Sequence, residues 1–364
     1  MNIVTKLKQS GERGSCPEQL GFGTAFSDHM FTQQYTADNG WHEAEIGPFR
    51  DLTLHPASAV LHYGQEVFEG LKAYRREDGG INLFRPDQNA ERFNRSARRM
   101  VMPEVAIEEH IDAIRQLVLV DEPWIPVGPG ASLYIRPTLI ADGALLGLGA
   151  ASSYLHFIFT APVGAYYAEG FNPVSVYVSE NYRRAVKGGV GEAKTGGNYS
   201  ASLFVSESAA KEGYSQVLWL DAVEGRYVEE VGAMNICFVY RDGTIATPEL
   251  TGSILAGVTR DSVLKIAGSL SHDTVEKRLD IEEVVSDIKS GEITEVFGCG
   301  TAAVISPVGR LAYKGQDHLI NNNESGPVAT ALYEKLTAIQ YGLAEDPLDR
   351  KSTRLNSSHL VISY

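Results

Sequence analysis

Two stretches in the first half of the chain repeat apolar residues at the spacing of an amphipathic helix. They cover residues 88–101 and 106–120, and Asp87 stands where the first helix would take its N-cap. The pattern predicts two helices that lie against a core. The residues expected to face inward are Ala90, Phe93, Ala97 and Met100 in the first stretch, and Ile107, Ile111, Ile114 and Val118 in the second.

Three further stretches of the first half, residues 60–62, 131–140 and 153–162, have the composition of strands. The last of them, SYLHFIFTAP, carries hydrophobic side chains on both faces. Such a strand is expected to lie well inside its sheet. The first half is therefore predicted to mix strands with helices.

The second half has the pattern of hairpins followed by helices. Asp242-Gly243 is a strong hairpin dipeptide, and Glu224-Gly225 marks a second turn. Because short turns join most strands, antiparallel pairing is expected to dominate, and the predicted fold class is α+β rather than a Rossmann-type sheet. The predicted elements are strands at 217–221, 227–231, 235–240 and 244–247 and helices at 260–270, 281–289 and 327–341.

The chain of 364 residues is long enough for two domains. Two glycines and a proline within residues 163–173 predict a linker. We therefore expect a smaller N-terminal domain at 1–163, an interdomain loop at 164–174 and a larger domain at 175–348. Residues 349–364 are treated as a separate tail.

Composition excludes several classes of protein. The formal net charge of −14 argues against a nucleic-acid partner, which needs a basic surface. The N-terminus lacks the apolar core of a signal peptide, and no apolar run reaches the length of a membrane helix. Three scattered cysteines indicate neither a disulfide framework nor a zinc site and suit a reducing cytoplasm. We expect no metal.

The stretch GEAKTGGNY at 191–199 raises a question about Lys194. With residues 188–190 it comes within one residue of the nucleotide-binding P-loop motif, but Ala193 replaces the second glycine. The P-loop also needs a helix directly after it, which Gly196-Gly197 would weaken. Lys194 is therefore a surface lysine, a phosphate-binding lysine or an amine that bonds covalently to a carbonyl compound.

Adjacent carboxylates at Glu229 and Glu230 point to opposite faces of a predicted strand. We interpret Glu229 as solvated. Glu230 would then face inward, where a buried carboxylate needs a positive partner such as a protonated heterocyclic nitrogen.

Other segments offer sites for anions. Arg92 neighbours the apolar stripe of its predicted helix and can bind a phosphate dianion bidentately. Glycine turns at 254–260 and 298–303 could bind anions through free N–H groups, or be ordinary tight turns. Tyr134 and Arg136 share one face of a predicted strand, and a buried arginine there would bind a carboxylate.

Taken together, these stretches resemble the branched-chain amino-acid aminotransferases, enzymes of the pyridoxal-phosphate class called fold type IV. The resemblance runs in order along the chain to about residue 348, and the Lys194 and Glu230 stretches are its most specific parts. The motifs are FEGLKAY (68–74), LFRPDQNAERFNRSARR (83–99), ASLYIRP (131–137), APVGAYY (161–167), GGVGEAKTGGNY (188–199), EEVGAMN (229–235), ILAGVTR (254–260) and EVFGCGTA (295–302).

The resemblance implies an α+β, two-domain fold like that of D-amino-acid aminotransferases, and pyridoxal 5′-phosphate as cofactor. Lys194 matches the lysine that bonds to the cofactor and moves the proton, Glu230 the carboxylate at the pyridine nitrogen, and Tyr199 the phenol at the ring oxygen. The residues that match the phosphate cup are Arg92, Val258, Thr259 and Thr301.

It also implies transfer of the amino group of leucine, isoleucine or valine to 2-oxoglutarate, in a homodimer. Residues that match substrate recognition are Tyr134 and Arg136, with the backbone of Thr301 and Ala302, for the carboxylate, and Phe68 and Tyr166 for the side chain. Elements that match contributions from the neighbouring subunit are Tyr63 and the loop Leu146, Gly147 and Leu148.

Alternatives and departures remain. A D-amino-acid aminotransferase or an aminodeoxychorismate lyase shares the fold type, although FEGLKAY and the Tyr134–Arg136 pair speak against both; a P-loop protein is the alternative of another class. Ala233 replaces a threonine of many relatives, and Ala303 and Ser306 replace a cysteine pair, so no redox switch of that kind is expected. The tail at 349–364 does not resemble the family, and we expect it to be disordered or poorly packed.

Overall fold

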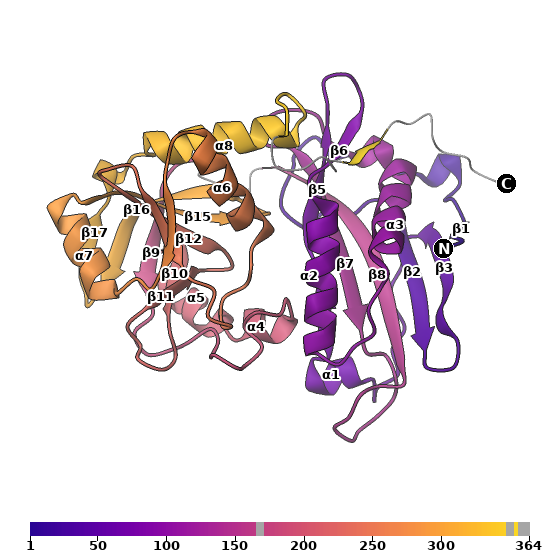
Figure 1. Cartoon of the computed structure of the whole chain (residues 1–364). Helices are drawn as coiled ribbons and strands as arrows, with labels where there is room; N and C mark the ends of the chain where they lie inside the picture. The colour runs from indigo at the N-terminus through magenta and orange to yellow at the C-terminus, as the bar shows by residue number, and fades with distance from the viewer. Residues whose placement is uncertain (165–170, 347–352, 356–364) are drawn as a thin grey trace. The chain divides into compact units, whose positions relative to one another are not determined.

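The structure of the chain is a computed structural model that describes residues 1–164, 171–346 and 353–355 (Figure 1). The chain forms two compact units. The first comprises Met1–Tyr166, Ala193–Gly196 and Gln340–Tyr364, and the second Tyr167–Glu192 and Gly197–Ile339. Lys194 thus belongs to the first unit although most of its sequence neighbours belong to the second.

The first unit is built on a mixed sheet with the strand order β1-β3-β2-β8-β7-β5-β6-β18, to which β4 adds by pairing with β7. Only β1 and β3 pair in parallel, so antiparallel pairing dominates among the described strands. The strands are β1 (Val4–Thr5), β2 (His29–Thr36), β3 (Gly40–Pro48), β4 (Glu66–Phe68), β5 (Leu71–Arg75), β6 (Ile81–Leu83), β7 (Ser132–Ile140), β8 (Ser153–Val163) and β18 (Thr353–Leu355).

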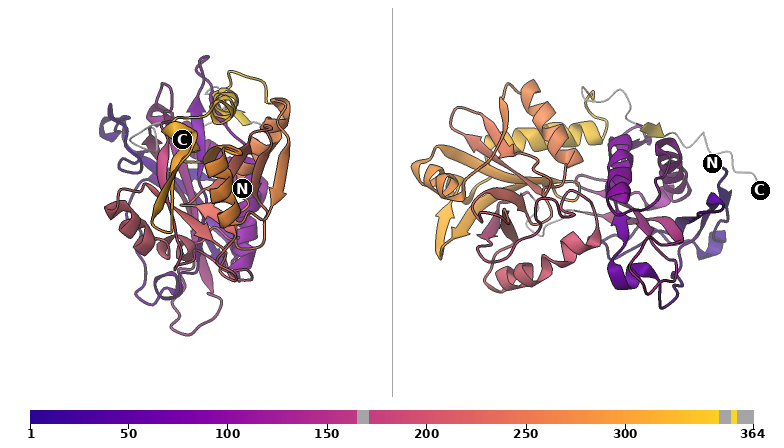
Figure 2. Two further views of the ribbon diagram at one scale, coloured as in Figure 1. Left: turned by 90° about the vertical axis from the view of Figure 1, so that its left-hand side faces the viewer. Right: turned by 60° about the horizontal axis from the view of Figure 1, so that its bottom comes forward.

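Two helices, α2 (Pro86–Arg99) and α3 (Ile107–Val120), lie side by side on one face of this sheet (Figures 1 and 2). Both were predicted, but α2 begins two residues earlier than expected. Pro86 takes the first turn, where proline fits best, so Arg85 and not Asp87 is the N-cap. In α3, Ile114 and Val118 are fully buried, whereas Ile107 and Ile111 are half-buried.

The strand predicted at 60–62 is wrong. These residues lie in a short helix, α1 (Ala59–Tyr63), which ends where Gly64 adopts a left-handed conformation at φ 57°. A short apolar run has no period that separates helix from strand, and here the left-handed glycine closes a helical turn.

The second unit has a sheet with the order β11-β10-β9-β16-β15-β12-β13-β14, and β17 pairs with β16. The predicted hairpin strands 217–221, 227–231, 235–240 and 244–247 are all present within one residue. The strands are β9 (Val174–Val178), β10 (Gln216–Leu220), β11 (Val228–Val231), β12 (Asn235–Tyr240), β13 (Ile245–Pro248), β14 (Thr274–Lys277), β15 (Ile293–Gly300), β16 (Val304–Tyr313) and β17 (Gln316–Leu319).

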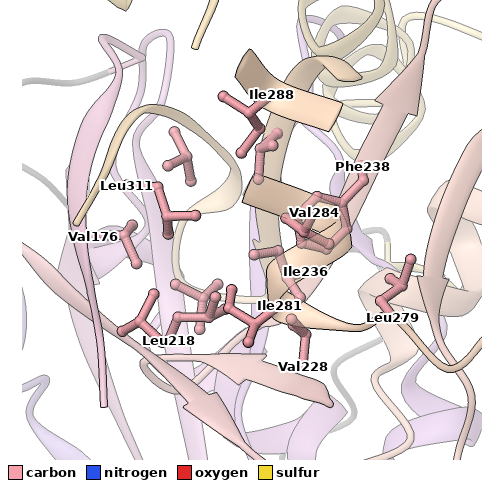
Figure 3. Close-up of a cluster of buried hydrophobic side chains, with 14 of the residues drawn as sticks. Val176, Leu218, Val228, Ile236, Phe238, Leu279, Ile281, Val284, Ile288 and Leu311 are labelled. Carbon is pink, nitrogen blue, oxygen red and sulfur yellow. The ribbon is translucent and has the colours of Figure 1, made fainter. Parts of the chain in front are cut away.

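Alternation along β10 shows how helices cover both faces of this sheet. Val217 and Trp219 pack against α5, whereas Leu218 and Leu220 join a core that includes the apolar face of α7 (Figure 3). The predicted helices correspond to α6, α7 and α8. The helices after β9 are α4 (Gly196–Ser200), α5 (Leu203–Lys211), α6 (Val258–Ser269), α7 (Ile281–Ser290) and α8 (Pro327–Gln340). Short 3₁₀ turns lie at Ser10–Glu12 and Glu122–Trp124 in the first unit and at Asn321–Asn323 in the second.

The tail departs from expectation at three residues. Thr353–Leu355 pair antiparallel with β6, so this part of the tail is placed in the first sheet. The other tail residues, 349–352 and 356–364, lie outside the described residues. Among the residues that the structure describes, no helix is long and apolar enough to cross a membrane.

Candidate active site

The backbone of Lys194 is held by two elements of the first unit. Its N–H donates to Ser96 Oγ of α2 at 2.9 Å, and its carbonyl accepts from the N–H of Phe68, at the end of β4, at 3.0 Å. Two residues further on, Gly196 donates its N–H to the carboxylate of Glu66. The loop that carries the lysine is therefore attached to one face of α2 and to the β4 strand.

The side chain of Lys194 lies beside an aromatic ring shared with a second cation. Lys194 Nζ is 4.8 Å from the centre of the Phe68 ring, and the Arg136 guanidinium carbon is 4.9 Å from the same centre. Arg136 Nη2 donates to Tyr134 Oη at 3.2 Å. Four residues predicted from sequence are thus brought together: the reactive amine, the apolar ring and the two groups proposed for the carboxylate.

Gly70 makes room for the Tyr134 hydroxyl. A Cβ at this position would lie 2.0 Å from Tyr134 Oη, closer than non-bonded atoms approach.

Lys72 of β5 pairs in register with Tyr134 and is buried. Burial lowers the pKa of Lys72 to about 8.

Arg92 occupies a buried position on α2 and binds Glu69 bidentately. Its Nε lies 2.7 Å from Glu69 Oε1 and its Nη2 2.9 Å from Oε2, while Asn89 Nδ2 donates to Oε2 at 2.7 Å. Burial alone would raise the pKa of Glu69, but the charge and hydrogen bonds of Arg92, with a contribution from Lys194, bring it below its usual range. Glu69 therefore stays ionised and fixes the plane of the guanidinium group.

Glu230 is the corresponding carboxylate of the second unit. It is buried on β11, with Arg184 Nη1 2.8 Å from its Oε2. Its Oε1 accepts from Asn235 Nδ2 at 3.2 Å and from the Leu255 N–H at 3.3 Å. The prediction that Glu230 faces inward is confirmed, and its positive partner within the chain is Arg184.

The solvated interpretation of Glu229 is wrong. Glu229 is only 7% exposed and accepts a hydrogen bond from the Ser253 hydroxyl. Burial raises its pKa, and the Ser253 hydrogen bond does not offset this. Both faces of β11 are covered in this fold, so alternation along the strand does not leave either carboxylate in solvent.

The N-terminus of α6 offers backbone donors. Gly257 is its N-cap and has no side-chain cap, so the N–H groups at Val258 and Thr259 lack partners within the helix. A Cβ on Gly257 would lie 2.0 Å from Asn235 Oδ1, so the close approach to β12 requires glycine. Such a terminus favours a phosphate group.

The remaining predicted residues are placed as follows. Thr301 and Ala302 form the turn between β15 and β16, and Tyr199 is half-buried on α4. In the first unit, Tyr63 on α1 donates its hydroxyl to the Leu146 carbonyl, and Leu146 and Leu148 are 70% and 89% exposed. Gly147 lies between them, and Tyr166 lies outside the described residues.

The local structure around Lys194 does not match a P-loop. The last strand before it, β9, ends at Val178, and residues 187–192 form turns. A helix does begin at Gly196, where we expected the glycines to weaken it, but it is only five residues long. Residues 174–200, all of which the structure describes, therefore lack the direct succession of strand, phosphate-binding loop and long helix.

Sequence reasoning missed the residues that support the predicted ones. They are Glu66, Glu69, Ser96, Arg184 and Asn235. Glu69, Ser96 and Asn235 lie inside motifs that were singled out, and position within such a motif was the available signal. Glu66 and Arg184 lie outside all of them.

Comparison with known proteins agrees with this geometry. The family model for amino-transferase class IV matches residues 66–311. A probable branched-chain-amino-acid aminotransferase of Staphylococcus aureus (strain MRSA252) is 50% identical over 345 residues, which is 94% of this chain and 96% of that protein. The branched-chain-amino-acid transaminase 1 of Bacillus subtilis (strain 168) is 50% identical over 334 residues, 92% of this chain and 94% of that protein.

Solved structures give the same result. The crystal structure of the Escherichia coli branched-chain amino acid aminotransferase is 30% identical, with a TM-score of 0.74 over 88% of this chain and 97% of that one. The branched-chain amino acid aminotransferase of T.th., solved with N-(5′-phosphopyridoxyl)-L-glutamate, is 28% identical, with a TM-score of 0.70 over 89% and 95%. The chain therefore belongs to the branched-chain aminotransferases, pyridoxal-phosphate enzymes of the class IV family.

Proposed function

We propose that this enzyme transfers the amino group of leucine, isoleucine or valine to 2-oxoglutarate, with Lys194 as the lysine that bonds to pyridoxal phosphate. The products are branched-chain 2-oxo acids and glutamate. The observation that carries this proposal is the placement of Lys194 beside Phe68, Arg136 and Tyr134, in a chain half identical to branched-chain aminotransferases over 94% of its length.

The residues present fit the cofactor in each unit. In the first, Lys194 supplies the amine and Arg92 a guanidinium already oriented by Glu69. In the second, the uncapped start of α6 suits a phosphate, with Thr301 as a further ligand, and Glu230, which is paired with Arg184, is assigned to a protonated ring nitrogen. Tyr199 is assigned to the ring oxygen.

When bound, pyridoxal phosphate supplies an electron sink for the carbanion formed at the substrate Cα. Lys194 would hold the cofactor and would carry the substrate Cα proton, as general base and then general acid. Glu230 would favour the protonated form of the pyridine nitrogen. The ring of Phe68, 4.8 Å from the amine, covers one side of Lys194 and limits the access of water to it.

Substrate recognition is assigned to an aromatic and basic group of the first unit and to backbone donors of the second unit. Tyr134 and Arg136, joined by their hydrogen bond, and the backbone N–H groups of Thr301 and Ala302 bind carboxylates. Phe68 is assigned to the substrate side chain, and so, from the sequence alone, is Tyr166, which lies outside the described residues. One arginine beside an aromatic wall accommodates both a leucine side chain and the second carboxylate of glutamate.

We also propose a homodimer and a cytoplasmic location. Tyr63 and the Leu146–Leu148 loop form an exposed apolar surface, and the hydrogen bond from Tyr63 to Leu146 fixes its conformation. A surface that contributes to the active site of a neighbouring subunit needs such a fixed conformation. Light scattering on the purified enzyme is expected to give twice the mass of one chain, and Leu148→Asp to shift that value toward the monomer.

A half-reaction tests the function directly. Purified holoenzyme is mixed with one amino acid and no acceptor, and the visible absorbance of the lysine-bound cofactor is followed. L-leucine, L-isoleucine and L-valine are expected to bleach it with release of one 2-oxo acid per site, whereas D-alanine has no effect. Lys211→Ala, at an exposed lysine of α5, serves as the control and behaves as wild type. Bleaching by D-alanine alone would instead assign a D-amino-acid aminotransferase.

A further inference from the structure

The second unit contains a cavity of about 320 Å³ that the proposed reaction does not use. Glu229 lines it, together with the loop that follows β10 and the segment after β13. Glu230, the next residue of β11, does not line this cavity. We call it the β11 cavity; its volume is at the lower end of the range of small-ligand pockets.

Glu229 is the unusual group of this cavity. It is a buried carboxylate with one hydrogen bond, from Ser253, and it forms no ion pair with any residue in the described part of the chain. The neighbouring Arg184 is directed to Glu230 instead. A buried carboxylate without a cation is costly, and an ammonium group entering the cavity would supply the missing charge.

Several charges around the cavity already have partners. Arg278 pairs with Glu224 at 2.8 Å and lies 3.5 Å from the centre of the Tyr227 ring. Asp221 accepts four backbone N–H groups of its own loop, from residues 223, 224, 226 and 227. These groups form part of the cavity wall. Because each already has a partner, its electrostatic interaction with a bound ligand would be weak.

Two lysines remain to receive an anionic group. Lys187 and Lys277 both line the cavity, and neither forms an ion pair with a described residue. Lys277 Nζ lies 4.7 Å from the centre of the Tyr240 ring. Val228, Ile254 and Pro248 add apolar surface to the cavity wall.

We propose that the β11 cavity binds a small zwitterionic amino acid with an apolar side chain. Its ammonium group pairs with Glu229, its carboxylate with Lys187 and Lys277, and its side chain contacts Val228 and Ile254. The site is separate from the catalytic one and goes beyond the proposed function, because no residue assigned to the reaction lines it.

Calorimetric titration with L-leucine tests the site. The holoenzyme is first converted to its pyridoxamine form with excess glutamate and freed of small molecules, so that the amine of leucine has no aldehyde to react with. The expected result is a saturable leucine site that Glu229→Gln weakens by at least about tenfold, since this change removes the charge that pairs with the ammonium. Lys187→Met, at the exposed side of the cavity, is expected to weaken it by about threefold or more.

Lys211→Met removes an equally exposed lysine outside the cavity and should leave leucine binding unchanged. The proposal is overturned if the wild type and both cavity variants bind leucine equally, or if the wild type shows no leucine site that these substitutions weaken. Lys187 is exposed, so Lys187→Met is expected to fold. This variant therefore tests the site even if Glu229→Gln fails to fold.

Discussion

Each unit contains a buried ion pair, and in each pair we assign one member to the cofactor. In the first unit Glu69 binds Arg92 bidentately at 2.7 and 2.9 Å; in the second Arg184 lies 2.8 Å from Glu230. The pairs have opposite roles. In the first the carboxylate orients the cation that we assign to the cofactor phosphate, and in the second the cation pairs with the carboxylate that we assign to the pyridine nitrogen.

The difference shows how a fold can keep a functional charge inside its core. Neither Arg92 nor Glu230 is exposed, and an unpaired charge at such depth would neutralise or destabilise the fold. Each pair therefore has one member assigned to the cofactor and one that compensates its charge. Lys194, by contrast, lies in a loop fixed by main-chain hydrogen bonds that do not involve the reacting amine.

The largest expected difference in activity is between a substitution of Lys194 and a substitution in an ion pair. Lys194→Ala removes both the covalent anchor and the proton carrier, and transamination of leucine should fall by about 10²–10⁴-fold or more. Glu230→Gln keeps size and hydrogen bonding and should retain more activity than Lys194→Ala. Steady-state kinetics with leucine and 2-oxoglutarate distinguishes them. Equal losses in both variants would contradict the assignment of the proton carrier to Lys194.

Breaking either pair should destabilise the fold. Glu69→Gln and Arg184→Met each leave a buried charge alone, at a cost of about 3–5 kcal/mol in the free energy of unfolding. Urea unfolding followed by circular dichroism measures it, with Glu104→Gln, from an exposed pair with Arg98, as the control expected to cost below about 1 kcal/mol. If the buried and the exposed substitutions lower the free energy of unfolding by the same amount, the buried pairs do not compensate charge in the core.

Two histidines of the first unit are buried without such compensation. His110 and His156 stack with ring centres 5.1 Å apart, and among the described residues none donates to or accepts from their ring nitrogens. Burial lowers the pKa of His110 to about 4 and that of His156 well below its usual value. Both rings are therefore neutral in the folded state at neutral pH.

Acid should destabilise the protein through these rings. The unfolded chain binds a proton at each histidine below about pH 6.5, and folded His110 does not until about pH 4. Stability is then lost as pH falls through this window, by about 3 kcal/mol for His110. His110→Phe should flatten the dependence of the unfolding free energy on pH between 4 and 6.5. An unchanged slope in this variant would show that His110 is protonated in the fold.

The smallest expected effect concerns substrate orientation rather than charge. Gly70→Ala places a methyl group against Tyr134 Oη and displaces the phenol that Arg136 binds. The KM for leucine should rise by about tenfold, with a smaller change in kcat, because the carboxylate partner is misplaced while Lys194 is not touched. Gly268→Ala, on α6 with no atoms near its added Cβ, provides the control for a glycine substitution. An unchanged KM in Gly70→Ala would remove Tyr134 from substrate recognition.

Local patterns predicted a good part of this molecule. The periodic stripes located α2 and α3, and the turn dipeptides located the hairpins of the second sheet, because both signals lie within a few neighbouring residues. Lys194 and Glu230 were chosen as candidate site residues for the same reason, since each lies in a short motif that contains glycine and a carboxylate.

Ion pairs between residues that are distant in the sequence could not be predicted from local patterns. Glu69 and Arg184 do not differ from other charged residues until the fold brings them against Arg92 and Glu230. The burial of Glu229 was missed because alternation separates the faces of a strand but does not say whether the second face is covered. The helix at α1 was missed because five residues are too few to show a period.

Mass spectrometry after chemical reduction tests the central claim most directly. Holoenzyme is treated with borohydride, which converts the carbon–nitrogen bond between lysine and cofactor into a stable secondary amine, and is then digested and sequenced. The expected result is one pyridoxyl-phosphate mass on the peptide that contains Lys194. An adduct on Lys187 or Lys72, or the absence of any adduct from an enzyme that transaminates leucine, would contradict the account.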